Sequence, residues 1–364
     1  MYQWPDPLDL PTAVDENLHS CMTHAKPFPH PTPTTKTAYT DASFEQRVIS
    51  YNVLMGNVCK KQRDAIKADP TGFLAVVPYG AGNCYFEDNP RAHLDIQDFV
   101  RSLRFLRPTT EEISKSVRET NKDIRDCFGK PWTLFLHGGS QCLRKFLLYQ
   151  QTFAISERIA FSVVPLDPNI FSWAICNLVG DGITPTLKDT ILAGVKRWLW
   201  KDDAFRAHID KVLAREGVPG SVNEQVLYVT NSYTLVLIHK KDERGNPAAI
   251  AQLRGKPITS NMANHLTYLQ LVCDGNYWIA LNHLKTRGQG VECQLCKADT
   301  HPTWDCPLHQ TPGWYGPKYD GAERHEDQAK RARDDDGFTT VTAQGSSSRG
   351  RGCGGQRATR GHGY

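Results

Sequence analysis

The stretch Cys293-Gln-Leu-Cys296-Lys-Ala-Asp-Thr-His301-Pro-Thr-Trp-Asp-Cys306 gathers three cysteines and one histidine in a single short segment. Their spacing is C-x2-C-x4-H-x4-C. Three thiolates and one imidazole are the donor set of closed tetrahedral Zn²⁺ sites, in which no position is left for a substrate. We therefore expect a structural Zn²⁺ ion. The alternative is four unrelated residues in a loop, which the spacing disfavours because such Cys and His patterns are comparatively specific.

The same spacing is that of the zinc knuckle, and the segment resembles the knuckles of retroviral gag-type nucleocapsid proteins and other RNA-binding proteins. Asp305 matches the acidic residue that often precedes the last cysteine. Gln294 stands where an aromatic residue is usual, and Thr300 stands where a glycine is usual. Trp304 is the one aromatic residue inside the loop. The resemblance implies a secure metal site, whereas the departures affect how a base would be recognised.

Composition limits the classes of protein to which the chain could belong. Its 364 residues can hold one or two domains with tails, and its formal charge of +4 excludes a uniformly basic nucleic-acid binder. Cysteines without paired spacing, together with a thiolate metal site, favour a reducing intracellular setting, cytoplasmic or nuclear. No secretory signal is apparent after Met1, and the apolar region at 159–179 is interrupted by proline and aspartate, so no membrane span is expected. The scattered cysteines are Cys21, Cys59, Cys84, Cys127, Cys142, Cys176, Cys273 and Cys353.

Both ends of the chain have the composition of disordered segments. Residues 1–43 are rich in proline, threonine and histidine, and residues 319–364 are first charged and then rich in glycine and serine. The last part, residues 345–364, contains no acidic residue, and its Arg-Gly dipeptides resemble the arginine–glycine tails of RNA-binding proteins. Its arginines are Arg349, Arg351, Arg357 and Arg360.

Between these ends the residue pattern predicts an α+β fold in four successive regions. Residues 44–128 form a mostly helical region with a short strand at 73–77, and residues 129–245 form an α/β block. Residues 246–290 form a helical connector, and residues 291–318 form the knuckle with an aromatic turn. Helices outside the block are expected to begin at Phe44, Ile96, Thr109 and Asn261. The sequence shows no internal repeat.

The α/β block alternates strands and helices in the order of a split βαβ, ferredoxin-like sandwich, which RNA-recognition-motif domains also use. Phe171 and Trp173 would share one face of a strand in this arrangement. Base stacking is one use of such a pair, and core packing is the commoner one. The expected strands are 133–137, 160–164, 171–176, 226–230 and 233–239, and the expected helices are 141–151, 184–199 and 204–215.

A family resemblance extends over roughly residues 70–318. The turn Pro78-Tyr-Gly-Ala-Gly82, the α/β block, and the knuckle with its extension Pro312-Gly-Trp-Tyr-Gly-Pro317 look like proteins of mushroom-forming fungi that are described as CCHC-type, gag-like or retroelement-derived. A neighbouring possibility is the first open-reading-frame protein of LINE-type retrotransposons. Either resemblance implies binding of zinc and nucleic acid without an established enzyme activity.

Motifs for catalysis are absent from the sequence. It contains no phosphate-binding P-loop, no Asp-Thr-Gly or Asp-Ser-Gly of an aspartic protease, and no Tyr-x-Asp-Asp of a reverse transcriptase. We therefore expect a non-enzymatic, gag-like, zinc-dependent protein that binds single-stranded nucleic acid, with RNA favoured over DNA. The expected contact residues are Trp304, Lys297, Lys285, Arg287, Arg349, Arg351, Arg357 and Arg360.

Three alternatives remain open. The knuckle could staple a protein–protein interaction module, a reading favoured by the acidic residues Glu292, Asp299 and Asp305 in and beside it. The α/β block could hold an enzyme site that sequence motifs do not reveal. The chain could also self-associate into a homo-oligomer, as a gag protein would.

Overall fold

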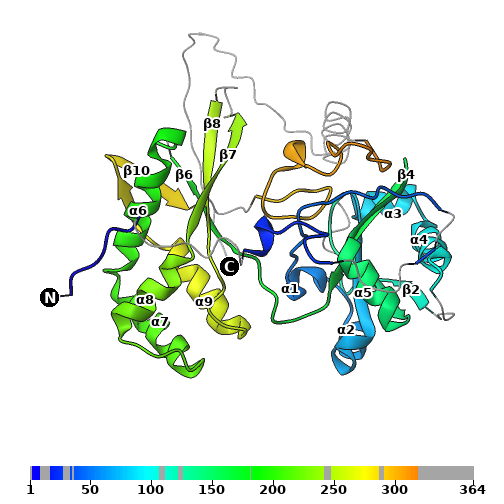
Figure 1. The fold of residues 1–364 in the computed structure, drawn as a ribbon, viewed down its shortest axis with the longest axis horizontal. Helices are drawn as coiled ribbons and strands as arrows, with labels where there is room; N and C mark the ends of the chain where they lie inside the picture. The colour runs from blue at the N-terminus through cyan, green and yellow to red at the C-terminus, as the bar shows by residue number, and fades with distance from the viewer. Residues whose placement is uncertain are drawn as a thin grey trace, which may run out of the picture. The chain divides into compact units, whose positions relative to one another are not determined.

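The computed structural model describes residues 2–8, 17–27, 33–34, 37–105, 111–121, 126–180, 182–241, 247–286 and 291–318. In these residues the chain forms nine α-helices and two antiparallel five-stranded sheets (Figure 1). The expected α+β class is confirmed. Among the same residues, no helix combines the length and the apolar character needed to cross a membrane.

The first sheet has the strand order β2-β3-β1-β5-β4, and every neighbouring pair in it is antiparallel. Two helices follow its first strand, and one helix follows its third. In chain order these elements are β1 (Phe73–Pro78), α3 (Asn83–Asp88), α4 (Ala92–Ser102), β2 (Glu111–Lys115), β3 (Leu134–Gly138), α5 (Gln141–Gln150), β4 (Thr152–Ser156) and β5 (Ile159–Pro165).

The second sheet has the strand order β7-β8-β6-β10-β9 and is also antiparallel throughout. Three helices follow its first strand, and one helix follows its third. In chain order these elements are β6 (Ala174–Val179), α6 (Lys188–Leu199), α7 (Asp203–Arg215), α8 (Val222–Asn231), β7 (Thr234–Lys241), β8 (Pro247–Arg254), α9 (Met262–Cys273), β9 (Tyr277–Ile279) and β10 (Asn282–Thr286).

The two sheets therefore share one topology. In each of them the first strand lies at the centre, the second and third strands form one side, and the fifth and fourth strands form the other. Helices occupy the same two connections, after the first and after the third strand. The chain thus contains a repeat of architecture that is not visible as a repeat of residues, because topology depends on which positions are buried and not on residue identity.

Both faces of the first sheet are covered. Side chains alternate along each strand, so each face has its own apolar cluster. One face packs against α4 and α5, and the other packs against α1 (Tyr51–Leu54) and α2 (Lys60–Ala68). The strand residues of the first cluster are Leu74, Val76, Ile113, Leu134, Leu136, Phe153, Ile159, Phe161 and Val163, and those of the second are Ala75, Val77, Phe135 and Val164.

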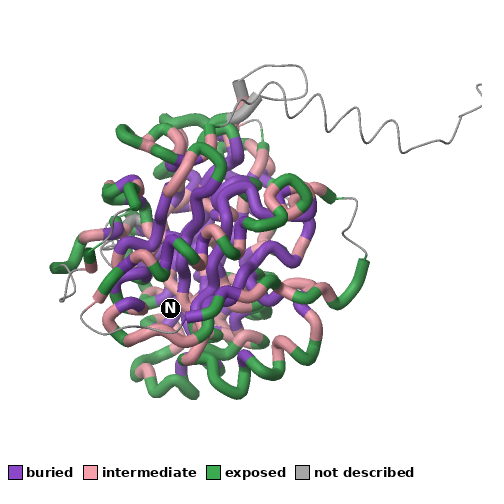
Figure 2. Tube along the Cα trace, turned by 90° about the vertical axis from the view of Figure 1, so that its right-hand side faces the viewer, coloured by how far each residue is buried: buried purple, intermediate pink, exposed green. Residues whose placement is uncertain are grey.

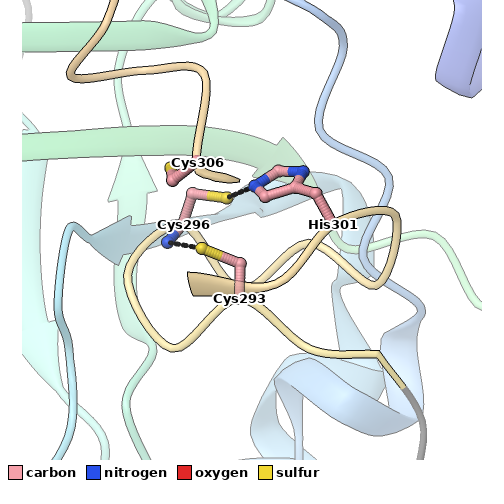
Figure 3. Close-up of side chains that lie close together, drawn as sticks. All are labelled: Cys293, Cys296, His301 and Cys306. Carbon is pink, nitrogen blue, oxygen red and sulfur yellow. Dashed lines mark hydrogen bonds between the residues drawn. The ribbon is translucent and has the colours of Figure 1, made fainter. Parts of the chain in front are cut away.

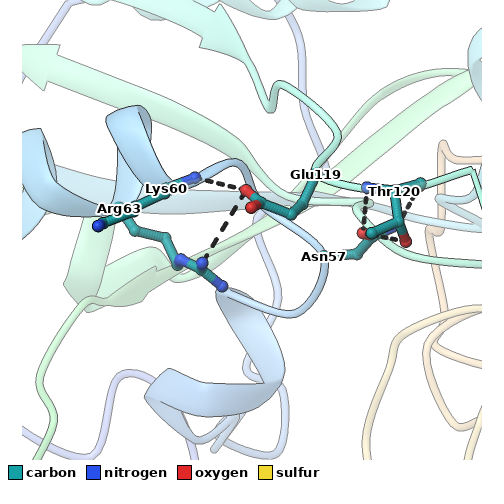
Figure 4. Close-up of polar contacts among 5 residues, drawn as sticks. All are labelled: Asn57, Lys60, Arg63, Glu119 and Thr120. Carbon is teal, nitrogen blue, oxygen red and sulfur yellow. Dashed lines mark hydrogen bonds and ion pairs between the residues drawn. The ribbon is translucent and has the colours of Figure 1, made fainter.

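Polar contacts join the segment around α2 to residues that follow β2 (Figure 4). Both belong to the first half of the chain, which contains the first sheet, whereas the second half contains the second sheet. The Glu119 carboxylate accepts a hydrogen bond from the Lys60 backbone N–H at 2.5 Å and lies 3.9 Å from Arg63. A carboxylate is favourable at this place because the first N–H groups of a helix lack partners within the helix. The Asn57 side-chain oxygen accepts hydrogen bonds from the backbone N–H and the hydroxyl of Thr120, at 3.0 and 3.1 Å.

The second sheet packs one face against α6 to α9. Figure 2 shows that buried residues of the chain lie in the interior and exposed residues lie at the surface. Inside this core the hydroxyls of Tyr233 and Tyr268 are 2.9 Å apart and fully buried. On the opposite face, Ile238 and Ile250 form a small cluster with Val291, the residue that leads into the knuckle. This face of the second sheet is therefore partly covered by the knuckle segment.

Several expected elements differ from those in the structure. Residues 226–230, expected as a strand, lie in α8, because Ser221 and Glu224 form a capping box and the apolar residues that follow are buried at helical spacing. The helix expected from Thr109 is absent among the described residues there, where Glu111 and Ile113 alternate inward in β2. The helix expected from Asn261 ends at Cys273 and is followed by β9 and β10.

Two further expectations need correction. The helix expected from Phe44 begins only at Tyr51, because the preceding residues are extended and the Phe44 carbonyl accepts a hydrogen bond from Thr23. The strands expected to form one sandwich over 129–245 are divided between the two sheets, since β3 and β5 belong to the first and β6 and β7 to the second. Local patterns predicted most of these strands, whereas their pairing depends on distant residues.

Parts of the N-terminal region contact the folded chain, although its composition predicts disorder. Trp4 stacks on Trp200 with ring centroids 4.9 Å apart. His19 accepts a hydrogen bond from the Trp173 backbone N–H at 3.0 Å. Residues 319–364, also expected to be disordered, lie outside the described residues.

Cys84 and Cys127, expected as unpaired thiols, form a disulfide that joins α3 to the loop before β3.

Candidate metal centre

The four expected ligands converge at one point of the fold (Figure 3). Cys293, Cys296, His301 and Cys306 are all buried, and their ligand atoms lie within 4.8 Å of one another. No other cluster of this kind occurs among the described residues. The structure thus brings together the residues that the sequence selected.

Local hydrogen bonds shape the loop around the first two cysteines. The Cys296 N–H donates to the Cys293 sulfur at 3.4 Å, and the Lys297 N–H donates to the Cys293 carbonyl at 2.9 Å. The Cys293 N–H in turn donates to the Ala298 carbonyl at 2.8 Å. Lys297 has a φ of 63°, a left-handed conformation that turns the chain back toward the sulfurs. The two-residue spacing therefore places both thiols on the same side of the loop.

His301 presents its Nε2 atom to the sulfurs. This nitrogen lies 3.3 Å from the Cys296 sulfur, and the Thr300 hydroxyl lies 3.1 Å from Nδ1. When the hydroxyl accepts from Nδ1–H, the tautomer with a free Nε2 is favoured, which is the usual role of a hydrogen-bond partner behind a ligating histidine. Thr300, which departs from the knuckle pattern, thus orients the imidazole.

The three thiols cannot all lose their protons while they lie side by side without a cation to compensate their charge. Burial opposes the charge of Cys296, but hydrogen bonds with Cys293 and Cys306 and the charge of Arg47 lower its pKa overall. Hydrogen bonding with Cys296 raises the pKa of Cys293 to about 12. One thiolate therefore keeps protons on its neighbours, and an ion that binds all three sulfurs displaces those protons. The S₃N donor set suits Zn²⁺, which would supply folding free energy to the loop.

Arg47 lies directly against this cluster, and the sequence analysis missed it. Its Nη1 donates to the Cys296 sulfur at 3.2 Å, and the residue is only 4% exposed. Its backbone N–H and C=O are both paired with the Gln151 side chain, at 2.6 and 3.0 Å. Three thiolates and a neutral imidazole leave a Zn²⁺ site with one net negative charge, which the guanidinium offsets. No local motif marks Arg47, because it contacts a residue 249 positions away in the sequence.

The knuckle is packed against the first half of the chain. The Gly80 N–H donates to the Leu295 carbonyl at 2.8 Å, and the Tyr79 hydroxyl lies 3.1 Å from His309 Nδ1. Tyr79 also shares an apolar cluster with Ala154 and Ala160 of the first sheet and with the buried residues of the knuckle. The knuckle therefore packs on the turn that contains Tyr79 and Gly80. The sequence indicated this turn only as part of a family resemblance.

The knuckle also contacts the second half. The Gln252 side chain donates to the Asp299 carbonyl at 2.8 Å, and Arg254 donates to the Thr300 carbonyl at 3.2 Å. Both donors lie on β8, on the face that the helices of the second half do not cover. The metal loop thus links the two sheets through its backbone.

The aromatic turn after the knuckle folds back onto this assembly. Trp314 lies 5.7 Å from the Tyr79 ring and 6.1 Å from the Phe44 ring, measured between centroids. The Tyr315 N–H donates to the Thr40 hydroxyl at 2.9 Å, so the N-terminal region also contacts this turn.

Three of the eight expected nucleic-acid contacts, Trp304, Lys297 and Lys285, belong to the described residues. Trp304 is 58% exposed and lies on the surface of the knuckle. Lys297 is half-buried, with its ammonium 4.9 Å from the Phe128 ring and 5.4 Å from the Trp132 ring, and burial lowers its pKa to about 8. Lys285 is exposed on β10. The remaining candidates, Arg287, Arg349, Arg351, Arg357 and Arg360, lie outside the described residues.

Phe171 and Trp173 are core residues. They are 3% and 4% exposed and precede β6, and Phe171 stacks on His265 at 4.2 Å. Core packing, the commoner alternative, is thus the correct one for this pair.

Comparison with known proteins found no match for the chain among protein-family models, curated proteins or solved structures.

Proposed function

We propose that the chain is a zinc-dependent, gag-like and non-enzymatic protein that binds single-stranded nucleic acid, RNA in preference to DNA. The observation that carries this proposal is the contrast inside the knuckle between four buried ligands and an indole, that of Trp304, which is 58% exposed. A flat aromatic side chain on a rigid, metal-held loop offers a stacking surface to an unpaired base. Phosphate contacts would come from Lys285, Arg287 and the arginines of the C-terminal segment.

The shared topology of the two halves supports the same proposal. Without the added strands β4 and β9, their strand orders are β2-β3-β1-β5 and β7-β8-β6-β10. This is the order of a split βαβ sandwich, and we infer that each half is a ferredoxin-like module. RNA-recognition-motif domains use this arrangement, and a pair of such modules followed by a knuckle is consistent with a gag-like or retroelement-derived protein.

Titration of fluorescein-labelled single-stranded RNA with the full chain, followed by anisotropy, tests the proposal. Trp304→Ala should keep its zinc and reduce affinity by about five- to a hundredfold, because base stacking contributes about 1–3 kcal/mol. Tyr228→Ala, which removes an equally exposed aromatic residue from α8, is the matched control. If the parent chain shows no saturable binding at low salt, the proposed function is wrong.

The second candidate function is a protein-interaction module whose fold is stabilised by zinc bound in the knuckle. It is favoured by the contacts of the knuckle with both halves, through Gly80 on one side and Gln252 and Arg254 on the other. In that case zinc removal would destabilise the fold, and the Trp304→Ala variant would bind RNA no differently from the parent chain.

A further inference from the structure

The hairpin of β9 and β10 exposes an aromatic side chain on the second sheet. Tyr277 and Ile279 are buried in the core with α6, so Trp278 between them points to the opposite face. Trp278 is 65% exposed, more than any other tryptophan of the described residues. The exposed indole offers a flat face on which an aromatic ring of a ligand can stack.

A histidine and a lysine extend this surface along β10. Trp278 and His283 are cross-strand partners, and their rings are stacked with centroids 4.7 Å apart and planes 10° from parallel. Lys285 follows two residues later on the same face and is exposed. One ring therefore supports the other, and a cation lies beside the stack.

Within the described part of the chain, no segment is seen to cover the exposed side of Trp278. The helices α6 to α9 pack on the other face. On the opposite face, Val291 packs with Ile238, Ile250 and Val179, and the knuckle contacts Gln252 and Arg254, so the described cover lies over β6, β7 and β8. In the first sheet the corresponding face packs against α1 and α2. An open platform is therefore specific to the second half of the described fold.

The charge of the second sheet favours an anionic ligand. None of its strands, β6 to β10, contains an aspartate or a glutamate. The first sheet, in contrast, carries Glu111 and Glu112 on β2. An exposed indole beside a lysine, on a sheet without acidic residues, matches a ligand that has both flat rings and negative charge.

We propose that Trp278, His283 and Lys285 form a stacking site for one unpaired nucleobase, with the adjoining phosphate on Lys285. The base continues the stack begun by the two side chains and lies on the free face of the indole. This inference rests on the proposed function and adds a second contact to it, separate from Trp304. Thr286 and Val291 are at most about 18 Å apart, so a single strand held at Lys285 can continue toward the knuckle.

The test uses the full chain with its zinc and a labelled single-stranded RNA of mixed sequence, with the same RNA as a duplex for comparison. Trp278→Ala should weaken single-strand binding by about five- to a hundredfold and leave duplex binding unchanged, since paired bases cannot stack on the indole. Lys285→Gln should lower the slope of log affinity against log salt by about 0.7. Tyr228→Ala is again the matched control, and zinc content and circular dichroism should match the parent.

The outcomes separate this inference from the proposed function. If Trp278→Ala and Lys285→Gln bind like the parent while Trp304→Ala is weakened, the site is wrong and the proposed function stands. If the parent itself does not bind, both are wrong. If Trp278→Ala retains full RNA affinity but changes the sedimentation of the chain from oligomer to monomer, the surface joins two copies of the chain and the stacking site is overturned.

Discussion

Arg47→Met removes the guanidinium that, among the described residues, donates to a sulfur of the candidate metal centre, while keeping a long apolar side chain in its place. In the parent, Arg47 donates to the Cys296 sulfur at 3.2 Å, and its Nε and Nη2 have no partner among the described residues. The side chain is therefore held there chiefly by the negative charge of the sulfurs. Without it, a zinc site with one net negative charge would be buried uncompensated.

The free energy that the zinc-loaded fold loses in Arg47→Met can be estimated from two contributions that overlap. A hydrogen bond to a charged group stabilises by about 1.5–3 kcal/mol, and removing one partner of a buried ion pair costs about 3–5 kcal/mol. We expect Arg47→Met to destabilise the zinc-loaded fold by about 3–4 kcal/mol, between the two ranges, because the sulfur charge is shared with the metal. Each 1.4 kcal/mol is about a factor of ten, so zinc affinity should fall roughly 100- to 1,000-fold.

Competition with a chromophoric zinc chelator measures this loss, and the absorption of the Co²⁺-substituted protein reports whether the sulfurs still coordinate. Arg47→Lys should recover part of the affinity, since it restores the charge without the planar donor group. Arg63→Met, at a partly exposed arginine of the same N-terminal half, is the control and should leave affinity unchanged. If Arg47→Met competes for zinc as well as the parent does, the guanidinium does not compensate the metal centre.

Four further outcomes are expected. Cys296→Ser should lose its zinc on metal analysis while Cys142→Ser, at a half-buried thiol outside the cluster, keeps it; equal zinc in both would contradict the ligand assignment. Tyr268→Phe should lower the free energy of unfolding in urea by about 1–3 kcal/mol, since it leaves a buried hydroxyl unpaired, and an unchanged midpoint would argue against that hydrogen bond. Deletion of residues 345–364 should weaken RNA binding of all sequences alike and flatten its salt dependence by about 0.7 per lost contact, and an unchanged slope would assign the segment another role. Burial, with two arginines nearby, lowers the pKa of His19 from 6.5 to about 3, so between these pH values the unfolded chain binds more protons than the folded chain and stability falls as the pH drops below 6.5. The urea midpoint of His19→Gln should therefore fall less between pH 7.5 and pH 5.5 than that of the parent, and parallel profiles would refute this linkage.

The sequence by itself predicted the four residues of the candidate metal centre and the general class of fold. The spacing of Cys293, Cys296, His301 and Cys306 is local, and short loops between ligands restrict the geometry enough for a pattern to be decisive. Strands such as β1, β3 and β5 were also predictable, because their apolar runs are short and continuous.

Only the tertiary structure decided which strands pair and which surfaces remain open. The repeated topology depends on pairing between strands far apart in the chain, such as β6 with β10, which no local pattern encodes. Arg47 meets the Cys296 sulfur, and Lys297 lies over the Phe128 and Trp132 rings, for the same reason. Trp278 and His283 are neighbours in one hairpin, but only the tertiary structure shows that Trp278 stays exposed. Coordination is dictated by neighbours in sequence, whereas burial, charge compensation and exposure are dictated by neighbours in space.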